Sequence, residues 1–192
     1  MYHIKTDIRA ERSSQLLYEA LMKCLEIKPF DQIQISDISR LSTVSRATFY
    51  RNFDSLIDIL AWKSDSKFKE ALTSYIASSP DLTKSGSLIE HVVRFWIRKE
   101  NLTIIETLVN MGRSDIVFNS FIANAGILLD YYESKGLYKK NSDYEYFISI
   151  RAGYLLGILR GWIMSGKKDS PEKVTSIVDK MTHDVSQSNV IF

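Results

Sequence analysis

Residues 45 to 52 gather side chains whose types and spacing suit contact with nucleic acid. The stretch reads SRATFYRN. An arginine such as Arg46 can bind guanine or hold a phosphate, and the hydroxyl groups of Ser45, Thr48 and Tyr50 can donate to phosphate oxygens. Ala47 is small enough to let a helix backbone approach a base pair. The chemistry that these residues predict is therefore recognition by hydrogen bonds and charge, not bond making.

Two short helices are needed to position these groups. Apolar spacing predicts helices over 35–41 and 46–52 with a turn at 42–44, and Ser45 is expected to cap the second helix by accepting from the N–H of Thr48. This is a helix-turn-helix, whose second helix enters the DNA major groove. The predicted core of the unit is Ile38, Val44, Phe49 and Phe53.

The segment 33–53, IQISDISRLSTVSRATFYRNF, resembles the DNA-binding domain of the TetR family of transcriptional regulators, and the triplet Thr48-Phe49-Tyr50 is its most specific part. The likeness extends from about residue 9 to about residue 60, and 153–166 is similar to a late helix of a Gram-positive branch of that family. The resemblance implies an operator-binding homodimer with a small-molecule effector, and it places Tyr50 on a phosphate. The DNA contacts that it implies are Gln34, Ser36, Ser45, Arg46, Ala47, Thr48, Tyr50, Arg51 and Asn52.

Three positions depart from the family pattern. Thr43 stands where glycine is usual, and a β-branched residue is strained if the turn is left-handed. Gln34 is a poor cap for the first helix, so Ser36 is expected to cap it instead. Leu56 replaces a lysine that often binds phosphate, which predicts weaker or less salt-sensitive DNA binding. These departures leave a second interpretation open, a relative that does not bind DNA and acts as a coactivator through protein contact.

Helical periodicity continues over the rest of the chain, with few prolines and glycines to interrupt it. We expect an all-α fold of about nine helices, an N-terminal three-helix domain followed by a C-terminal bundle. Buried positions are expected to include Leu17, Leu21 and Cys24, and also Leu41 beside Ile35 and Ile38. The further predicted helices span 9–26, 55–78, 87–99, 101–110, 115–134, 143–165 and 171–183. The predicted divisions are a DNA-binding domain at 1–54, a connecting helix at 55–78, and a ligand-binding and dimerisation domain at 79–192.

The C-terminal half holds candidate ligand-binding residues. Phe95, Trp96 and Phe118 are aromatic and could line an effector pocket, as the resemblance implies. Aromatic side chains at helical spacing are also ordinary core residues. Both interpretations stand at this point.

Three glycines recur every four residues on one predicted helix. Gly153, Gly157 and Gly161 each cost about 1 kcal/mol relative to alanine in a helix, so close helix approach is the expected reason. The approach could be tight packing within one subunit or a dimer interface. We favour the dimer, since two copies would present two recognition helices to a near-palindromic DNA site.

Composition excludes several classes. The net charge is only +2, so any nucleic-acid contact must come from a local patch, and the single cysteine forms no intramolecular disulfide. The N-terminal residues lack the apolar run of a secretory signal, and the most apolar stretch, 152–159, is followed at once by Arg160. We therefore expect a cytoplasmic protein that makes no membrane contact.

No constellation indicates catalysis. His3, His91 and His183 lie far apart and do not have a metal-ligand spacing, and no glycine-rich phosphate loop or nucleophile motif is present. We expect neither an enzyme nor a bound metal or cofactor.

Overall fold

The computed structural model describes residues 1–4, 7–81, 87–137, 139, 143–170, 172–177 and 180. The chain divides into two compact units, Met1–Ser66 and Lys67–Phe192. The division falls inside the helix predicted to connect two domains. Within the described residues the structure has no strand, only one isolated bridge between Tyr2 and Phe53, which confirms the all-α fold.

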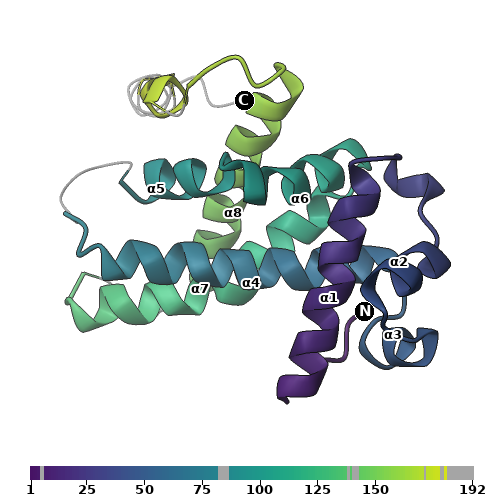
Figure 1. Ribbon diagram of the computed structural model, residues 1–192. Coiled ribbons are helices and arrows are strands. Elements are labelled where there is room, and N and C mark those ends of the chain that lie inside the picture. Colours follow the sequence, from purple (N-terminus) through teal and green to yellow (C-terminus); the bar gives the residue numbers. More distant parts are fainter. Residues whose placement is uncertain are drawn as a thin grey trace. The chain divides into compact units, whose positions relative to one another are not determined.

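The elements of the first unit are α1 (Ile8–Leu25), the 3₁₀ helix η1 (Phe30–Gln32), α2 (Ile35–Ser42), α3 (Arg46–Asn52) and the first part of α4 (Leu56–Ala77). The short helices α2 and α3 lie beside the longer α1 (Figure 1). Helix α1 begins where the carboxylate of Asp7 accepts from the N–H of Ala10, at 2.7 Å. Leu17, Leu21 and Cys24 are buried, as predicted. Burial raises the pKa of the Cys24 thiol, which agrees with a packing role.

The second unit is a helical bundle. It holds the rest of α4 and then α5 (Ser87–Trp96), α6 (Lys99–Asn110), α7 (Ser114–Ser134) and α8 (Tyr144–Met164). Residues 172–177 are also helical, and the rest of the helix expected at 171–183 lies largely outside the described residues. In the core, the Phe68 ring lies 4.8 Å from that of Trp96 and 5.9 Å from that of Phe121. Aromatic packing between helices distant in sequence thus holds this unit together.

The boundary between two predicted helices lies earlier than expected. The helix expected at 87–99 ends at Trp96, and the next one, expected at 101–110, begins at Lys99 as α6. The buried side chain of Asn101 donates to the backbone oxygen of Phe95, at 2.8 Å, and so ties the end of α5 to the start of α6. This contact satisfies a carbonyl near the helix end that has no partner within α5. Gly136 and Gly166 follow the ends of α7 and α8, and their left-handed φ angles of 70° and 84° are usual for residues that close a helix.

Helix α8 is long and apolar enough to cross a membrane by length and composition. Its best 18-residue window has a mean hydropathy of 1.3, and 28% of that window is buried within the chain. The charge of Arg160 after 152–159 therefore does not by itself exclude a span by the whole helix. Ile148, Ala152 and Leu155 nevertheless lie on a face buried in the bundle. One such partly buried helix is weak evidence for a span, and the absence of membrane contact stays a prediction.

Candidate nucleic-acid interface

Helix α3 has an inner and an outer face. Phe49 is fully buried and packs against Phe53, whose ring centre is 5.9 Å away. The outer face carries the exposed side chains of Arg46, Ala47, Tyr50 and Arg51. Tyr50 remains 56% exposed although its ring meets the edge of Phe49. The structure thus places four of the predicted DNA contacts on one accessible surface, at i, i+1, i+4 and i+5.

The start of α3 follows the prediction. Ser45 is the N-cap, and its Oγ accepts from the backbone N–H of Thr48 at 3.1 Å. The two hydroxyl groups also contact each other at 3.0 Å. Both side chains therefore fix the first turn of α3, next to the exposed Arg46.

The turn before α3 is left-handed at a residue ill suited to it. Thr43 has φ 59° and ψ 12°. A Cβ is disfavoured there, and a β-branched residue more so, so the departure noted from the sequence carries the expected strain. The turn also corrects one predicted core position. Leu41 is 46% exposed, and Ser42 is buried in its place, with its Oγ accepting from the N–H of Val44.

The start of α2 also differs from the prediction. Gln34 occupies the N-cap position, and the Asp37 carboxylate accepts from its backbone N–H at 3.0 Å. Lys28 donates to the same carboxylate at 2.6 Å, and these bonds lower the pKa of Asp37. Ser36 does not cap the helix; its hydroxyl donates to the Gln34 side chain at 3.3 Å. The side chain of Gln34 remains exposed and available for other contacts.

Asn52 is not on the outer face. Its side chain is buried, with 2% of the residue exposed, and its Nδ2 donates to Ser13 Oγ at 3.0 Å and to Ser14 Oγ at 3.2 Å. The DNA contact implied for Asn52 is therefore contradicted. The reason lies in the spacing, because position 52 is three residues after Phe49 and shares its inward face. Asn52 instead joins the end of α3 to α1.

The first residues of the chain reach the same end of α3. We call Met1–Ile4 the N-terminal strap. Its backbone pairs with the junction of α3 and α4: the N–H of His3 donates to the Asn52 oxygen at 2.8 Å, and the N–H of Asp54 donates to the Met1 oxygen at 3.2 Å. Nothing in the sequence of these four residues predicted this pairing, which depends on a chain reversal around α1.

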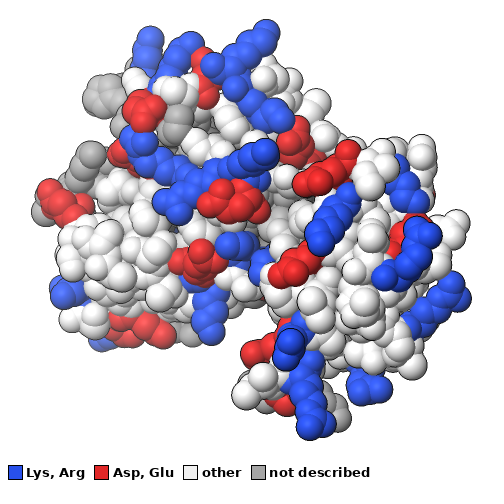
Figure 2. Space-filling view, viewed as in Figure 1, with Lys and Arg blue, Asp and Glu red and all other residues white. Residues whose placement is uncertain are grey.

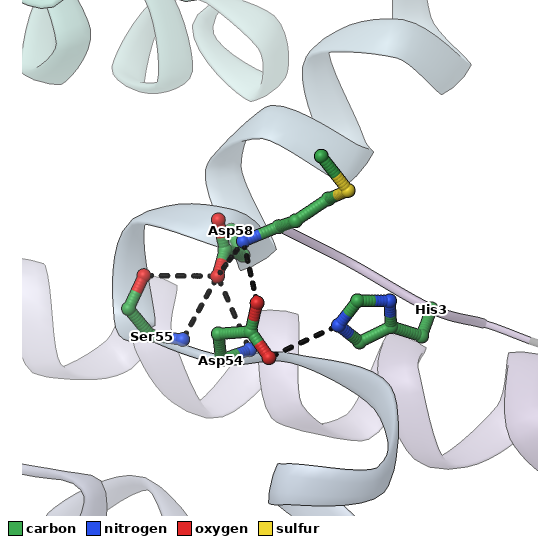
Figure 3. Close-up of polar contacts among 5 residues, drawn as sticks. His3, Asp54, Ser55 and Asp58 are labelled. Atoms are coloured by element: carbon green, nitrogen blue, oxygen red, sulfur yellow. Dashed lines mark hydrogen bonds and ion pairs between the residues drawn. The ribbon is translucent and has the colours of Figure 1, made fainter.

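Side chains reinforce the strap (Figure 3). The Nε2 of His3 lies 3.0 Å from Asp54 Oδ1, and the α-amino group of Met1 lies 2.9 Å from Oδ2 of both Asp54 and Asp58. The buried Asp58 carboxylate also accepts from the N–H of Ser55 at 2.8 Å, which fixes the first turn of α4. The ammonium group and then His3 lower the pKa of Asp54 by hydrogen bonding.

Charge over this unit is local. Residues 36–53 hold three arginines and one aspartate, and all three arginines are exposed. Figure 2 shows Lys and Arg side chains in small groups over the region of α1 to α3, several of them beside Asp or Glu, with uncharged surface between the groups. Leu56, at the first position of α4, adds no charge there. This pattern fits a few directed phosphate contacts better than a broad cationic surface.

The second unit contains a small cavity of ≈ 30 Å³ among α5, α7 and α8. None of the three predicted pocket residues lines it: Phe95 and Trp96 are buried elsewhere in the core, and Phe118 is half-buried. The residues that line it are Leu88, Ile89, Val92, Phe121, Arg151, Tyr154 and Leu155. Sequence reasoning missed Arg151 and Tyr154, although a cation and a phenol three residues apart in an apolar helix were a usable signal.

The glycine row of α8 faces away from the bundle. Gly153, Gly157 and Gly161 are exposed, and a Cβ built on any of them would meet none of the described atoms within 4 Å. Among the described residues, tight packing within one subunit, the first of the two explanations, therefore finds no support. The same face carries Tyr146, Ile150 and Met164, which are 73%, 71% and 66% exposed.

Comparison with solved structures supports the fold. The protein Lin0861 from Listeria innocua superposes with a TM-score of 0.72 at 17% identity, over 95% of this chain and 96% of that one. The fatty acid degradation regulator FadR from Bacillus halodurans superposes with a TM-score of 0.57 at 15% identity, over 88% and 93%. No family model and no curated protein sequence matches the chain. At these identities the likeness establishes a shared helical fold, of a kind found in a transcription regulator.

Proposed function

We propose that this protein is a sequence-specific DNA-binding transcriptional regulator of the TetR type. The observation that carries the proposal is the outer face of α3, where Arg46, Ala47, Tyr50 and Arg51 are exposed together while Phe49 is fully buried. A helix buried on one side and polar on the other, preceded by a second short helix and a tight turn, can enter a major groove. FadR, which has the same fold, is a regulator, and this supports the proposal by analogy alone.

Each exposed group has a distinct role in this proposal. Arg46, in the first turn, reaches a base edge or an adjacent phosphate. Ala47 allows close approach of the helix backbone. Tyr50 and Arg51 lie one turn further along and contact the flanking phosphates, which fix the register of the helix on the duplex.

We propose that the protein binds its DNA site as a homodimer. The outward face of α8 presents apolar side chains and a row of glycines to solvent, and a second copy of the same helix would cover both. Small residues let two helix backbones approach closely, and a twofold interface uses the same patch on both subunits. Two α3 helices would then have to fit half-sites about 34–36 Å apart.

The proposed mechanism is repression released by a small molecule. An effector bound among α5, α7 and α8 would shift the spacing of the two reading helices, and it can act only through different affinity for the two states. The cavity described there is far smaller than the ~300–1,000 Å³ of usual ligand pockets, so a ligand must enlarge it by moving side chains. Arg151 and Tyr154 supply the polar groups of an otherwise apolar lining.

A second candidate is a relative that has lost operator binding and acts as a coactivator through protein contact. Two observations favour it: the strained Thr43 in the turn and the uncharged Leu56 at the start of α4. Under this alternative, α3 binds no DNA and substitutions on its outer face do not change any DNA affinity.

Selection of genomic fragments by the purified protein at moderate salt tests the two candidates. The wild type is expected to enrich a near-palindromic site, and the Arg46→Ala/Tyr50→Ala double variant is expected to enrich none. A charge-matched control is Lys69→Ala, an exposed lysine of the second unit. Equal enrichment by the double variant would remove α3 from the interface. Failure of the wild type to enrich any fragment would favour the coactivator.

A further inference from the structure

The N-terminal strap supplies a partner that α3 lacks by itself. The last carbonyl groups of any helix have no partner within that helix, and a glycine in the left-handed conformation often provides the closing bonds. After α3 the chain instead turns extended at Phe53, with φ −141° and ψ 140°. The oxygen of Asn52 accepts from the N–H of His3, so the strap closes this helix end.

This closure matters because α3 has only seven residues. Helices much shorter than ~12 residues are marginal alone, so their orientation depends on their caps and on tertiary contacts. Ser45 fixes the start of α3, and Asn52 with the strap fixes its end. Tyr50 and Arg51 lie in the half of the helix that the strap holds.

Two side chains anchor the strap, Tyr2 to α4 and His3 to Asp54, which precedes α4. The hydroxyl of Tyr2 donates a hydrogen bond to the carboxylate of Asp65, and burial together with this bond raises the pKa of Tyr2. His3 contacts Asp54, as Figure 3 shows, and this contact is ionic when the ring is protonated. These anchors join residues more than fifty positions apart in the sequence, all within the first unit.

We propose that Tyr2 and His3 are positioning residues for DNA reading: through the strap they hold the C-terminal turn of α3, and with it Tyr50 and Arg51, in the geometry that fits a groove. The proposal rests on the proposed function of α3. It assigns no DNA contact to the strap. Loosening the strap reduces the fraction of molecules whose α3 is ready to bind, and the apparent dissociation constant rises in proportion.

The experiment measures two quantities for each variant: amide hydrogen exchange in the DNA-free protein and affinity for the operator. The variants are Tyr2→Phe, which removes one hydroxyl and keeps the ring, His3→Ala, and His3→Lys, which places a hydrogen-bond donor beside Asp54 again. Tyr131→Phe in the second unit is the matched control. Amides of Leu17 and Leu21 in α1 report on global unfolding, since both residues are fully buried.

We expect Tyr2→Phe and His3→Ala to speed exchange in the last turn of α3 and to leave the α1 amides unchanged. Operator affinity should fall by about three- to tenfold in both, and affinity for random DNA should fall with it, because Tyr50 and Arg51 are assigned to phosphates. His3→Lys should recover exchange protection and operator affinity together. Tyr131→Phe should alter neither.

Three results would overturn the positioning role. Unchanged exchange in both strap variants means that the strap does not hold α3. Weaker operator binding with unchanged exchange means that the strap contacts DNA directly. If the wild type binds no DNA, the proposed function fails, and so does the role of the strap in DNA binding. Faster exchange in the variants would then show that the strap only stabilises the structure of α3.

Discussion

The side-chain amide of Asn52 donates a hydrogen bond to the hydroxyl of Ser14, 3.2 Å away, and so fastens the last residue of α3 to the middle of α1. Both residues are buried, at 2% and 0% exposed. The same amide nitrogen also reaches Ser13 Oγ. A residue that ends the proposed reading helix thus serves the packing of the first unit rather than its surface.

Replacing Asn52 by alanine should lower the free energy of unfolding by about 1–3 kcal/mol, because the buried hydroxyl of Ser14 loses its partner. Urea denaturation measures this change. Asn119→Ala, at an exposed position of α7, is the control and should change stability little. If Asn52→Ala left stability intact and abolished DNA binding, the contact implied by the family resemblance would be right after all.

Replacing Thr43 by glycine should raise the free energy of unfolding by about 0.5–1 kcal/mol, because glycine adopts φ 59° without a Cβ clash. Thr43→Ala keeps the Cβ and should gain less. Thermal unfolding of the three proteins checks the order. A glycine variant no more stable than alanine would show that the turn carries no strain.

Local signals in the sequence predicted much of the first unit, while long-range contacts escaped it. The bounds of α3 and the cap by Ser45 follow from eight consecutive residues, and both are confirmed. The burial of Asn52 depends on Ser13 and Ser14, nearly forty positions away, and the exposure of Leu41 depends on where the turn ends α2. Periodicity places a residue on a face, but only the fold decides what covers that face.

The second unit shows the same limit. Glycine spacing correctly marked one side of α8 as unusual, yet the sequence could not tell an inner side from an outer one. Aromatic density indicated Phe95 and Trp96, whereas the described cavity lies against Arg151 and Tyr154. Helix packing across the bundle decides which aromatic side chains fill the core and which line a cavity.

Stability should fall on mild acidification because of His91. Its Nε2 lies 2.9 Å from Ser74 Oγ, and burial, followed by the charge of Arg98, lowers the pKa of the ring. The unfolded chain, with a histidine pKa near ~6.5, therefore takes up the proton first as the pH falls. The stabilisation is complete above about pH 6.5 and is lost below it.

Melting temperatures between pH 8 and pH 5 test this prediction. The wild type should lose stability below about pH 6.5 more steeply than His91→Gln, which has no proton to gain. The two curves should run parallel between pH 7 and pH 8. Parallel curves over the whole range would mean that the His91 ring titrates alike in both states.

Replacing Gly157 by alanine should strengthen the helix and weaken the proposed dimer. In the monomer the gain is up to about 1 kcal/mol, since the added Cβ meets no described atom. Gly126→Ala in α7 is the matched control, because its Cβ also meets none. Sedimentation equilibrium should show a larger dissociation constant for Gly157→Ala and an unchanged one for Gly126→Ala. Equal constants in all three proteins would exclude the α8 face as the interface.

The most direct test of the central claim is the affinity of the selected operator fragment for single variants of α3, measured by fluorescence anisotropy at two salt concentrations. Arg46→Ala and Tyr50→Ala should each weaken binding by about 1–3 kcal/mol with unchanged circular dichroism, and Tyr50→Ala, as a phosphate contact, should do so across sequences. Lys69→Ala should bind as the wild type does. Wild-type affinity in both α3 variants would contradict the claim that this helix reads DNA.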